Sequence, residues 1–225
     1  VETSGDPYPG KDLGTHEFVA SPEILGNYFE GLQLDPATYS AESPYGVPVV
    51  PSMVLAEVDA GFPGAFYGDD HGTLWIRQEW ELHKPMMPDE TYVAGSRVLD
   101  IYEHRDRTVV NQEVELRTAD GDLMALGRHH QSFLLGQGTG PVKLRDPAAK
   151  GVRRMAVPDG EALDPVERVL TLEMCGVYFH GNANYHTDKE EARRLGFEDV
   201  VIGGRMTMSY IGDLMDRHFG KGWYE

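Results

Sequence analysis

Apolar and polar residues alternate over four long stretches in the middle of the chain. The even-numbered positions of residues 73–82 are mostly apolar: Leu74, Ile76, Trp80 and Leu82. This period of two is typical of a β-strand with one buried face. Similar stretches follow at residues 92–102, 108–117 and 123–135, and the polar segments 103–106 and 120–122 between them have the length of hairpin turns. The pattern therefore predicts four long antiparallel strands.

The segment before these strands begins with polar residues and then turns helical. Residues 1–20 show no clear period and are predicted to form an irregular arm. Ser21 is a good N-cap and Pro22 suits the first helical position, so a helix is expected over residues 22–30.

Two further segments have the apolar density of buried helices. Residues 51–60 are rich in Met, Val, Leu and Ala and end at Gly61 and Pro63, which stop helices. Residues 204–219 repeat apolar side chains at helical spacing and predict a second buried helix. The first 135 residues therefore predict an α+β fold, in which the long strands wrap an apolar helix.

Between the strands and the second buried helix the pattern changes twice. Residues 164–175 carry closely spaced Val and Leu and predict another strand. Residues 188–196 predict a short helix, with Asp188 as N-cap and Gly196 as C-cap.

A weak internal repeat suggests how the chain is organised. The segments 49–53 and 201–206 each combine Val, a turn residue and Met, and each leads into a buried-type helix. We expect an N-terminal unit over residues 1–140, a linker rich in Gly, Pro, Asp and Lys over 141–164, and the start of a second unit over 165–225. A buried-type helix is unstable without a covering layer, so we expect either a fragment or a partner chain that supplies further strands.

Composition narrows the classes of partner and compartment. The formal net charge is −17, which argues against nucleic-acid binding because that function needs a basic face. The chain has one cysteine, Cys175, so an internal disulfide and a cysteine metal cluster are excluded. No apolar run reaches the length of a bilayer span. A cytoplasmic protein without membrane or nucleic-acid partners is expected.

The candidate catalytic and binding residues lie in two segments. These are Gly181-Asn182-Ala183-Asn184-Tyr185-His186-Thr187-Asp188 and the later Gly203-Gly204-Arg205. An imidazole suits proton transfer near neutral pH. A glycine pair at a helix start lets a carbonyl oxygen approach the positive end of the helix dipole. Together they predict a site for a reaction that passes through an oxyanion.

The same residues resemble the MaoC-like (R)-specific enoyl-CoA hydratases and dehydratases of the double-hotdog type. The similarity rests on the run from His186-Thr187-Asp188 through Gly196-Phe197 to Gly204. It implies a hotdog fold, with one complete hotdog, non-catalytic, followed by the start of a second. It also implies a lyase that hydrates or dehydrates an acyl thioester, needs no cofactor, and takes CoA or a carrier protein as part of its substrate. Homo- or hetero-oligomers with other hotdog chains are implied as well.

The chain departs from the family pattern at the acidic position. The family's proline is absent, and either Asn182 or Gly181 falls where the catalytic Asp belongs, depending on a one-residue gap. Gly203 replaces the family's His before the glycine. The resemblance implies His186 as the proton-transfer group and the Gly204 amide as oxyanion donor, and Asn182 is left to position water or substrate. Residues expected to bind substrate are Tyr185, Asn184, Gly203 and Arg205.

Other interpretations stay open at the sequence level. A metal site is not favoured, because His129 and His130 point to opposite faces of a strand and no zinc-binding spacing occurs. The missing Asp suits a catalytically degenerate hotdog subunit that binds or shapes the acyl pocket for a partner. A thioesterase is a third possibility, which needs a carboxylate or another water-activating group facing the glycine helix.

Overall fold

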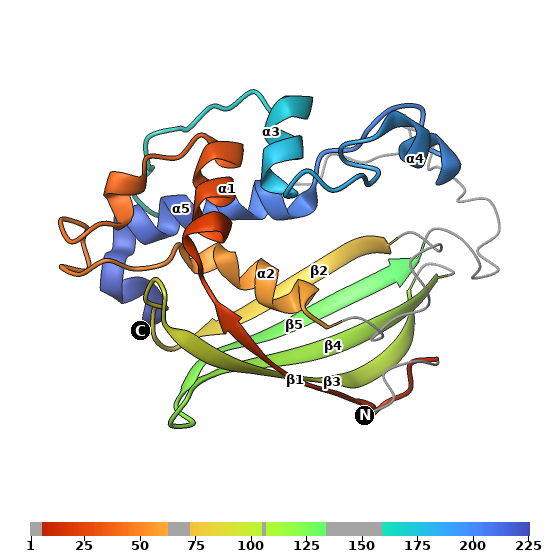
Figure 1. Ribbon diagram of the computed structural model, residues 1–225, viewed down its shortest axis with the longest axis horizontal. Coiled ribbons are helices and arrows are strands. Elements are labelled where there is room, and N and C mark those ends of the chain that lie inside the picture. The colour runs from red at the N-terminus through yellow and green to blue at the C-terminus, as the bar shows by residue number, and fades with distance from the viewer. Residues whose placement is uncertain (1–5, 63–72, 105–106, 134–158) are drawn as a thin grey trace.

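An antiparallel sheet covered on one side by helices makes up the part of the chain that the computed structural model describes, residues 6–62, 73–104, 107–133 and 159–225 (Figure 1). The strands are β1 Asp12–Val19, β2 Thr73–Leu82, β3 Thr91–His104, β4 Arg107–Thr118 and β5 Leu123–Phe133. The helices are α1 Pro22–Leu32, α2 Leu55–Ala60, α3 Leu172–Tyr178, α4 Lys189–Arg194 and α5 Gly204–Phe219. Short 3-10 turns lie at Pro36–Tyr39, Ser52–Val54 and Gly220–Tyr224.

The strand order is β1-β3-β4-β5-β2, and every neighbouring pair is antiparallel. The four strands predicted from the period of two are confirmed as β2 to β5, and so is the α+β class. β1 and β2 form the two edges of the sheet.

The prediction of an irregular arm over residues 1–20 is wrong for β1. This strand pairs with β3 from Asp12 opposite Arg97 to Val19 opposite Thr91. Its period was hidden because Gly14, with φ of 84°, lies where the register shifts. Backbone pairing with β3, which the apolar pattern does not report, fixes the strand.

The core lies between the sheet and α2. The predicted buried helix is confirmed, but it consists of the six-residue α2 preceded by a 3-10 turn, and Gly61 is its C-cap. Val54, Leu55 and Val58 are almost fully buried and belong to one apolar cluster with the inner face of the sheet. The sheet residues of that cluster include Ala94, Val98, Val110, Val114 and Leu116.

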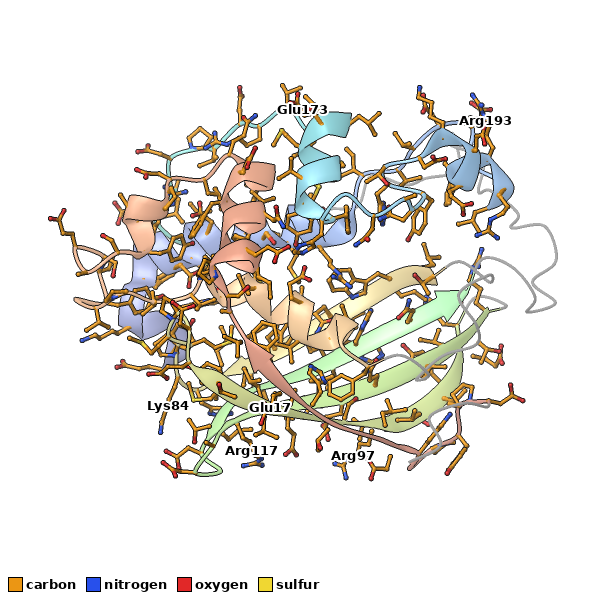
Figure 2. All side chains as sticks on the ribbon, viewed as in Figure 1. Glu17, Lys84, Arg97, Arg117, Glu173 and Arg193 are labelled. Atoms are coloured by element: carbon orange, nitrogen blue, oxygen red, sulfur yellow. The ribbon has the colours of Figure 1, made fainter. Side chains whose placement is uncertain are left out.

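The opposite face of the sheet is charged. Arg97 and Arg117 point away from the helices (Figure 2). Glu113 accepts hydrogen bonds from Arg97 Nη2 at 2.7 Å and from Arg128 Nε at 3.2 Å. Arg128 also reaches Glu81 on β2 at 2.7 Å. This cross-strand charge network leaves the inner face as the only apolar face of the described sheet.

Residues 164–175 do not form the predicted strand. The chain has no regular structure from 159 to 171, and Val169 is 83% exposed. Thr171 accepts a hydrogen bond from Met174 N at 3.2 Å and so caps α3. An apolar run becomes a strand only beside another strand, and here the N-cap and packing on α1 favour a helix. Gly31 of α1 makes that packing possible, because a Cβ at this position would lie 2.6 Å from Tyr178 N. The expected linker, residues 141–164, lies mostly outside the described residues.

α5 forms as predicted, but its buried face differs from the expected apolar stripe. The buried positions are Met206, Ser209, Gly212, Asp213 and Asp216. Ile211 and Phe219 are instead 64% and 49% exposed. Within the described residues, no helix is both long enough and apolar enough to cross a bilayer.

Candidate functional site

The loop between α3 and α4 is held in shape by its own polar groups. Asn184 Oδ1 accepts a hydrogen bond from His186 N at 2.8 Å. Thr187 Oγ1 donates to the Asn182 carbonyl at 2.7 Å and accepts from Asn184 N at 3.0 Å. Asp188 caps α4, as predicted, through Glu190 N and Glu191 N. These contacts give His186 a fixed backbone position.

The His186 imidazole is half-buried and has one defined tautomer. Its Nδ1 lies 2.7 Å from the Val201 carbonyl, which can only accept, so Nδ1 carries the proton and the neutral ring keeps a lone pair on Nε2. The ring stacks on Phe179 with centroids 4.8 Å apart. Burial lowers the pKa of His186, the Val201 carbonyl raises it, and the Arg205 charge lowers it. The net effect is a lowered pKa, so the His186 ring is held in the neutral form, which can accept a proton.

The two glycines at the start of α5 lie in different surroundings. Gly203 is buried, and a Cβ on it would lie 2.5 Å from the Phe179 ring. Gly204 is exposed, and a Cβ there would meet Trp75 at an ordinary 3.6 Å. The first N–H groups of a helix have no intrahelical acceptor, and Gly203 supplies no side-chain cap. The α5 start thus offers donors beside the Phe179–His186 stack.

A cleft of about 280 Å³ opens at Gly204. Its other lining residues are Trp75, Ile76, Arg77, Gln78 and Met208. A second cleft of about 300 Å³ shares Gln78 and Met208 and continues along β2 and α5 past Trp80, Leu82, Ile211 and Trp223. Space for a ligand therefore runs from the α5 start along the edge of the sheet.

Arg205 joins this helix start to α2. Its Nη1 lies 3.5 Å from Glu57 Oε1, and Glu57 Oε2 lies 3.6 Å from His180 Nε2. Asn27 Nδ2 lies 2.8 Å from the other ring nitrogen of His180. The Glu57, His180 and Arg205 side chains are 20–28% exposed, so they are shielded but reachable. The sequence reasoning did not select Glu57 or His180 for the site; the available signal was a carboxylate inside the dense apolar run 51–60.

A second acid and imidazole lie deeper. Asp59 Oδ2 is 3.8 Å from His129 Nδ1, and both side chains are almost fully buried. Burial raises the pKa of Asp59 to about 7, although Arg205 and Gln78 act in the opposite direction. Burial, with the charges of Arg205 and His130, lowers the pKa of His129 to about 3. His129 is thus neutral at physiological pH, and the contact is not a full ion pair.

The structure brings four of the seven predicted site residues together. His186, Gly203, Gly204 and Arg205 gather at the α5 start. Tyr185 stands beside the His186 ring, but its hydroxyl donates to the Thr73 carbonyl at 2.7 Å, so it anchors the loop to β2. Asn184 shapes the loop, and Asn182 is exposed. Among the described residues, no three His, Cys, Asp or Glu side chains converge as a metal site requires.

Comparison with known proteins connects this geometry to one fold. No protein-family model and no curated protein matches the sequence. A solved MaoC-like dehydratase superposes with a TM-score of 0.66 at 18% identity, over 91% of this chain and 77% of that chain. A MaoC-like dehydratase from Phytophthora capsici gives 0.60 at 17% identity, over 96% and 76%. The peroxisomal multifunctional enzyme type 2 from Drosophila melanogaster gives 0.64 at 14% identity, over 93% and 38%. The chain therefore has the hotdog fold of the MaoC-like dehydratases.

Proposed function

We propose that the protein is a hydro-lyase that adds water to, or removes it from, an acyl thioester. The observation that carries the proposal is that one ring, Phe179, stacks on the neutral imidazole of His186 and also lies against Gly203 at the start of α5. His186 keeps its Nε2 lone pair because Nδ1 is bound to Val201, and Gly204 opens onto a cleft. An enoyl thioester needs these two functions, a base for water and a donor for the thioester oxygen.

The hydration step balances with these groups. His186 Nε2 takes a proton from water as the water oxygen bonds to the β-carbon. The π electrons of the double bond move through the α-carbon onto the thioester oxygen, where the Gly204 N–H stabilises the negative charge. The α-carbon of the enolate then takes this proton from the protonated His186 Nε2, so the imidazole returns to its neutral form and the thioester carbonyl re-forms. Dehydration is the same sequence reversed.

The energy available from such an arrangement is large enough to matter. One preorganised oxyanion donor contributes about 3–4 kcal/mol to transition-state stabilisation in known acyl-transfer sites. A positioned general base contributes roughly 100-fold to 10,000-fold in rate. No cofactor enters the proposal, and CoA or a carrier protein would be part of the substrate. Assembly with other hotdog chains, identical or different, belongs to the same proposal and is tested by native mass spectrometry.

Replacing His186 tests the proposal directly. We expect His186→Ala to lower kcat/KM for crotonyl-CoA hydration at least about 100-fold, because the base is lost. The matched control is His218→Ala, which removes an exposed imidazole from the far end of α5. Equal turnover by the wild type and His186→Ala would contradict the assignment.

A catalytically silent subunit that shapes the acyl pocket is the second candidate. Asn182 favours it, because an amide at the acidic position cannot transfer a proton. Calorimetry with butyryl-CoA, a saturated thioester that cannot be hydrated, separates the two. Binding without hydration of crotonyl-CoA supports the silent subunit, and release of free thiol from either thioester points to a thioesterase.

A further inference from the structure

The carboxylate of Glu57, on α2, pairs with Arg205 at the start of α5. Its neighbours Ala56 and Val58 are 1% exposed, whereas its own side chain is 20% exposed. A half-buried carboxylate is costly without charged or hydrogen-bonding partners. Arg205 is a charged partner of Glu57 at 3.5 Å, and His180 Nε2 lies 3.6 Å from the same carboxylate.

His180 holds an unusual backbone conformation at this point. It is one of three non-glycine residues with positive φ in the described chain, at 57°. This conformation is common where a helix ends, and here His180 N and Gly181 N donate back to the Val177 and Gly176 carbonyls of α3. Asn27 Nδ2 donates to His180 Nδ1, so the neutral ring carries its proton on Nε2, which faces Glu57. The end of α3 thus places the His180 ring against the Glu57 carboxylate.

The Glu57 cluster and the His186 stack meet through two adjacent residues. Phe179 stacks on His186 and fills the space above Gly203. The next residue, His180, turns its imidazole to Glu57. Arg205 connects them a second time, because it pairs with Glu57 and its charge lowers the pKa of His186. Both clusters therefore belong to the same end of α5.

We propose that Glu57 supplies from α2 the acidic catalytic group that the loop lacks at Asn182. This inference rests on the proposed hydro-lyase function. In the hydration step, one proton of the attacking water goes to His186 Nε2, and the second O–H donates a hydrogen bond to the Glu57 carboxylate. Glu57 thereby aims the water oxygen at the β-carbon. His180 is a positioning residue that acts through Glu57.

Asp59 is the rival carboxylate on the same helix, and geometry disfavours it. Its side chain is 3% exposed, against 20% for Glu57. A group that contacts the reacting water must be accessible, and the more exposed Glu57 side chain meets this condition better. Glu57 also lies directly against the residue that follows Gly204.

The test compares Glu57→Gln and Glu57→Asp with Glu173→Gln in the full protein. Glu173 is an exposed carboxylate on α3, pointing to solvent at the top of the helical layer (Figure 2). We expect Glu57→Gln to lower kcat for crotonyl-CoA hydration about 100-fold with a smaller change in KM. Glu57→Asp should recover part of the rate, and Glu173→Gln should match the wild type.

Two further measurements keep the inference testable. If Glu57→Gln does not fold by circular dichroism, His180→Gln decides, with an expected rate loss of about tenfold and an altered acidic limb of the kcat/KM pH profile. A folded Glu57→Gln variant with the wild-type kcat would overturn the role of Glu57. An unchanged rate and pH profile in His180→Gln would do the same. Both results leave the proposed hydro-lyase function standing. A wild-type protein that neither binds nor hydrates crotonyl-CoA overturns the proposed function, and the role of Glu57 with it.

Discussion

Gly203 and Gly204 are adjacent in sequence, yet only Gly203 is required by packing. A methyl group on Gly203 would overlap the Phe179 ring, whereas one on Gly204 has room beside Trp75. We expect Gly203→Ala to lower the free energy of unfolding by about 1–3 kcal/mol, the usual cost of overpacking. Gly204→Ala should change it by less than about 1 kcal/mol.

Urea unfolding of the two variants checks this prediction, since each differs from the wild type by one methyl group. Equal losses of unfolding free energy in the two variants would show that the Phe179 ring does not restrict the size of the side chain at position 203. A drop in stability that is confined to Gly203→Ala would mark Phe179 as the residue that fixes His186 against the helix start.

At the level of single residues, the sequence was enough to select those candidate site residues that local patterns mark. His186 lies in a polar segment, and Gly203 and Gly204 follow a short helix later, so two nearby local patterns were enough to select them. Glu57 and His180 were not selected, because they meet only after α2, α3 and α5 pack together. No local pattern encodes a contact between such distant positions.

At the level of elements, α5 is attached to the N-terminal half by a buried carboxylate. Asp216 accepts hydrogen bonds from the Tyr39 and Tyr45 hydroxyls at 3.3 and 3.0 Å. It also accepts from Ser52 N and Ser52 Oγ, each at 2.9 Å. These bonds tie α5 to the segments before and at the start of α2.

Burial raises the pKa of Asp216 to about 6, although the bonds from Ser52, Tyr45 and Tyr39 act in the opposite direction. Between about pH 4 and pH 6 Asp216 therefore binds more protons in the folded state than in the unfolded state, so the contribution of this group to stability falls as pH rises. Relative to the wild type, we expect Asp216→Asn to gain about 2–3 kcal/mol across this range.

Chemical denaturation of both proteins at pH 4, 5, 6 and 7 measures that difference. The lost hydrogen-bond acceptor adds an offset that does not vary with pH, so only the change with pH tests the titration. Parallel stability curves would mean that Asp216 is already ionised at pH 4 in the folded protein.

Elements with a strong intrinsic period were predictable, and those defined by a neighbour were not. The alternation of apolar and polar residues predicts β2 to β5, and the N-cap Ser21 followed by Pro22 predicts α1. β1 depends on pairing with β3, and α3 depends on its Thr171 cap and on α1. For α5, the helical period was visible in the sequence. Its buried face is acidic because Tyr39, Tyr45 and Ser52 donate hydrogen bonds to the aspartates on it.

At the level of the whole molecule, charge is the dominant feature. The chain has 37 acidic and 20 basic side chains, an excess of 17 negative charges. The Arg128–Glu81 ion pair on the outer face of the sheet joins partly exposed groups, and such pairs contribute roughly 0–1 kcal/mol each. Repulsion among the surplus carboxylates opposes the compact state, because folding brings them closer.

Salt should therefore stabilise this protein at neutral pH. Raising NaCl from low concentration to about 0.15 M shortens the screening distance to about 8 Å and weakens both the repulsion and the surface ion pairs. The repulsion involves more charges, so we expect a net gain of about 1 kcal/mol, or about 2–4 °C in Tm. The control is the same increase in NaCl concentration near pH 4.8, the isoelectric point of the sequence. There the surplus is gone, and salt should leave Tm unchanged or lower it; an equal rise at both pH values would trace the effect to general salting-out.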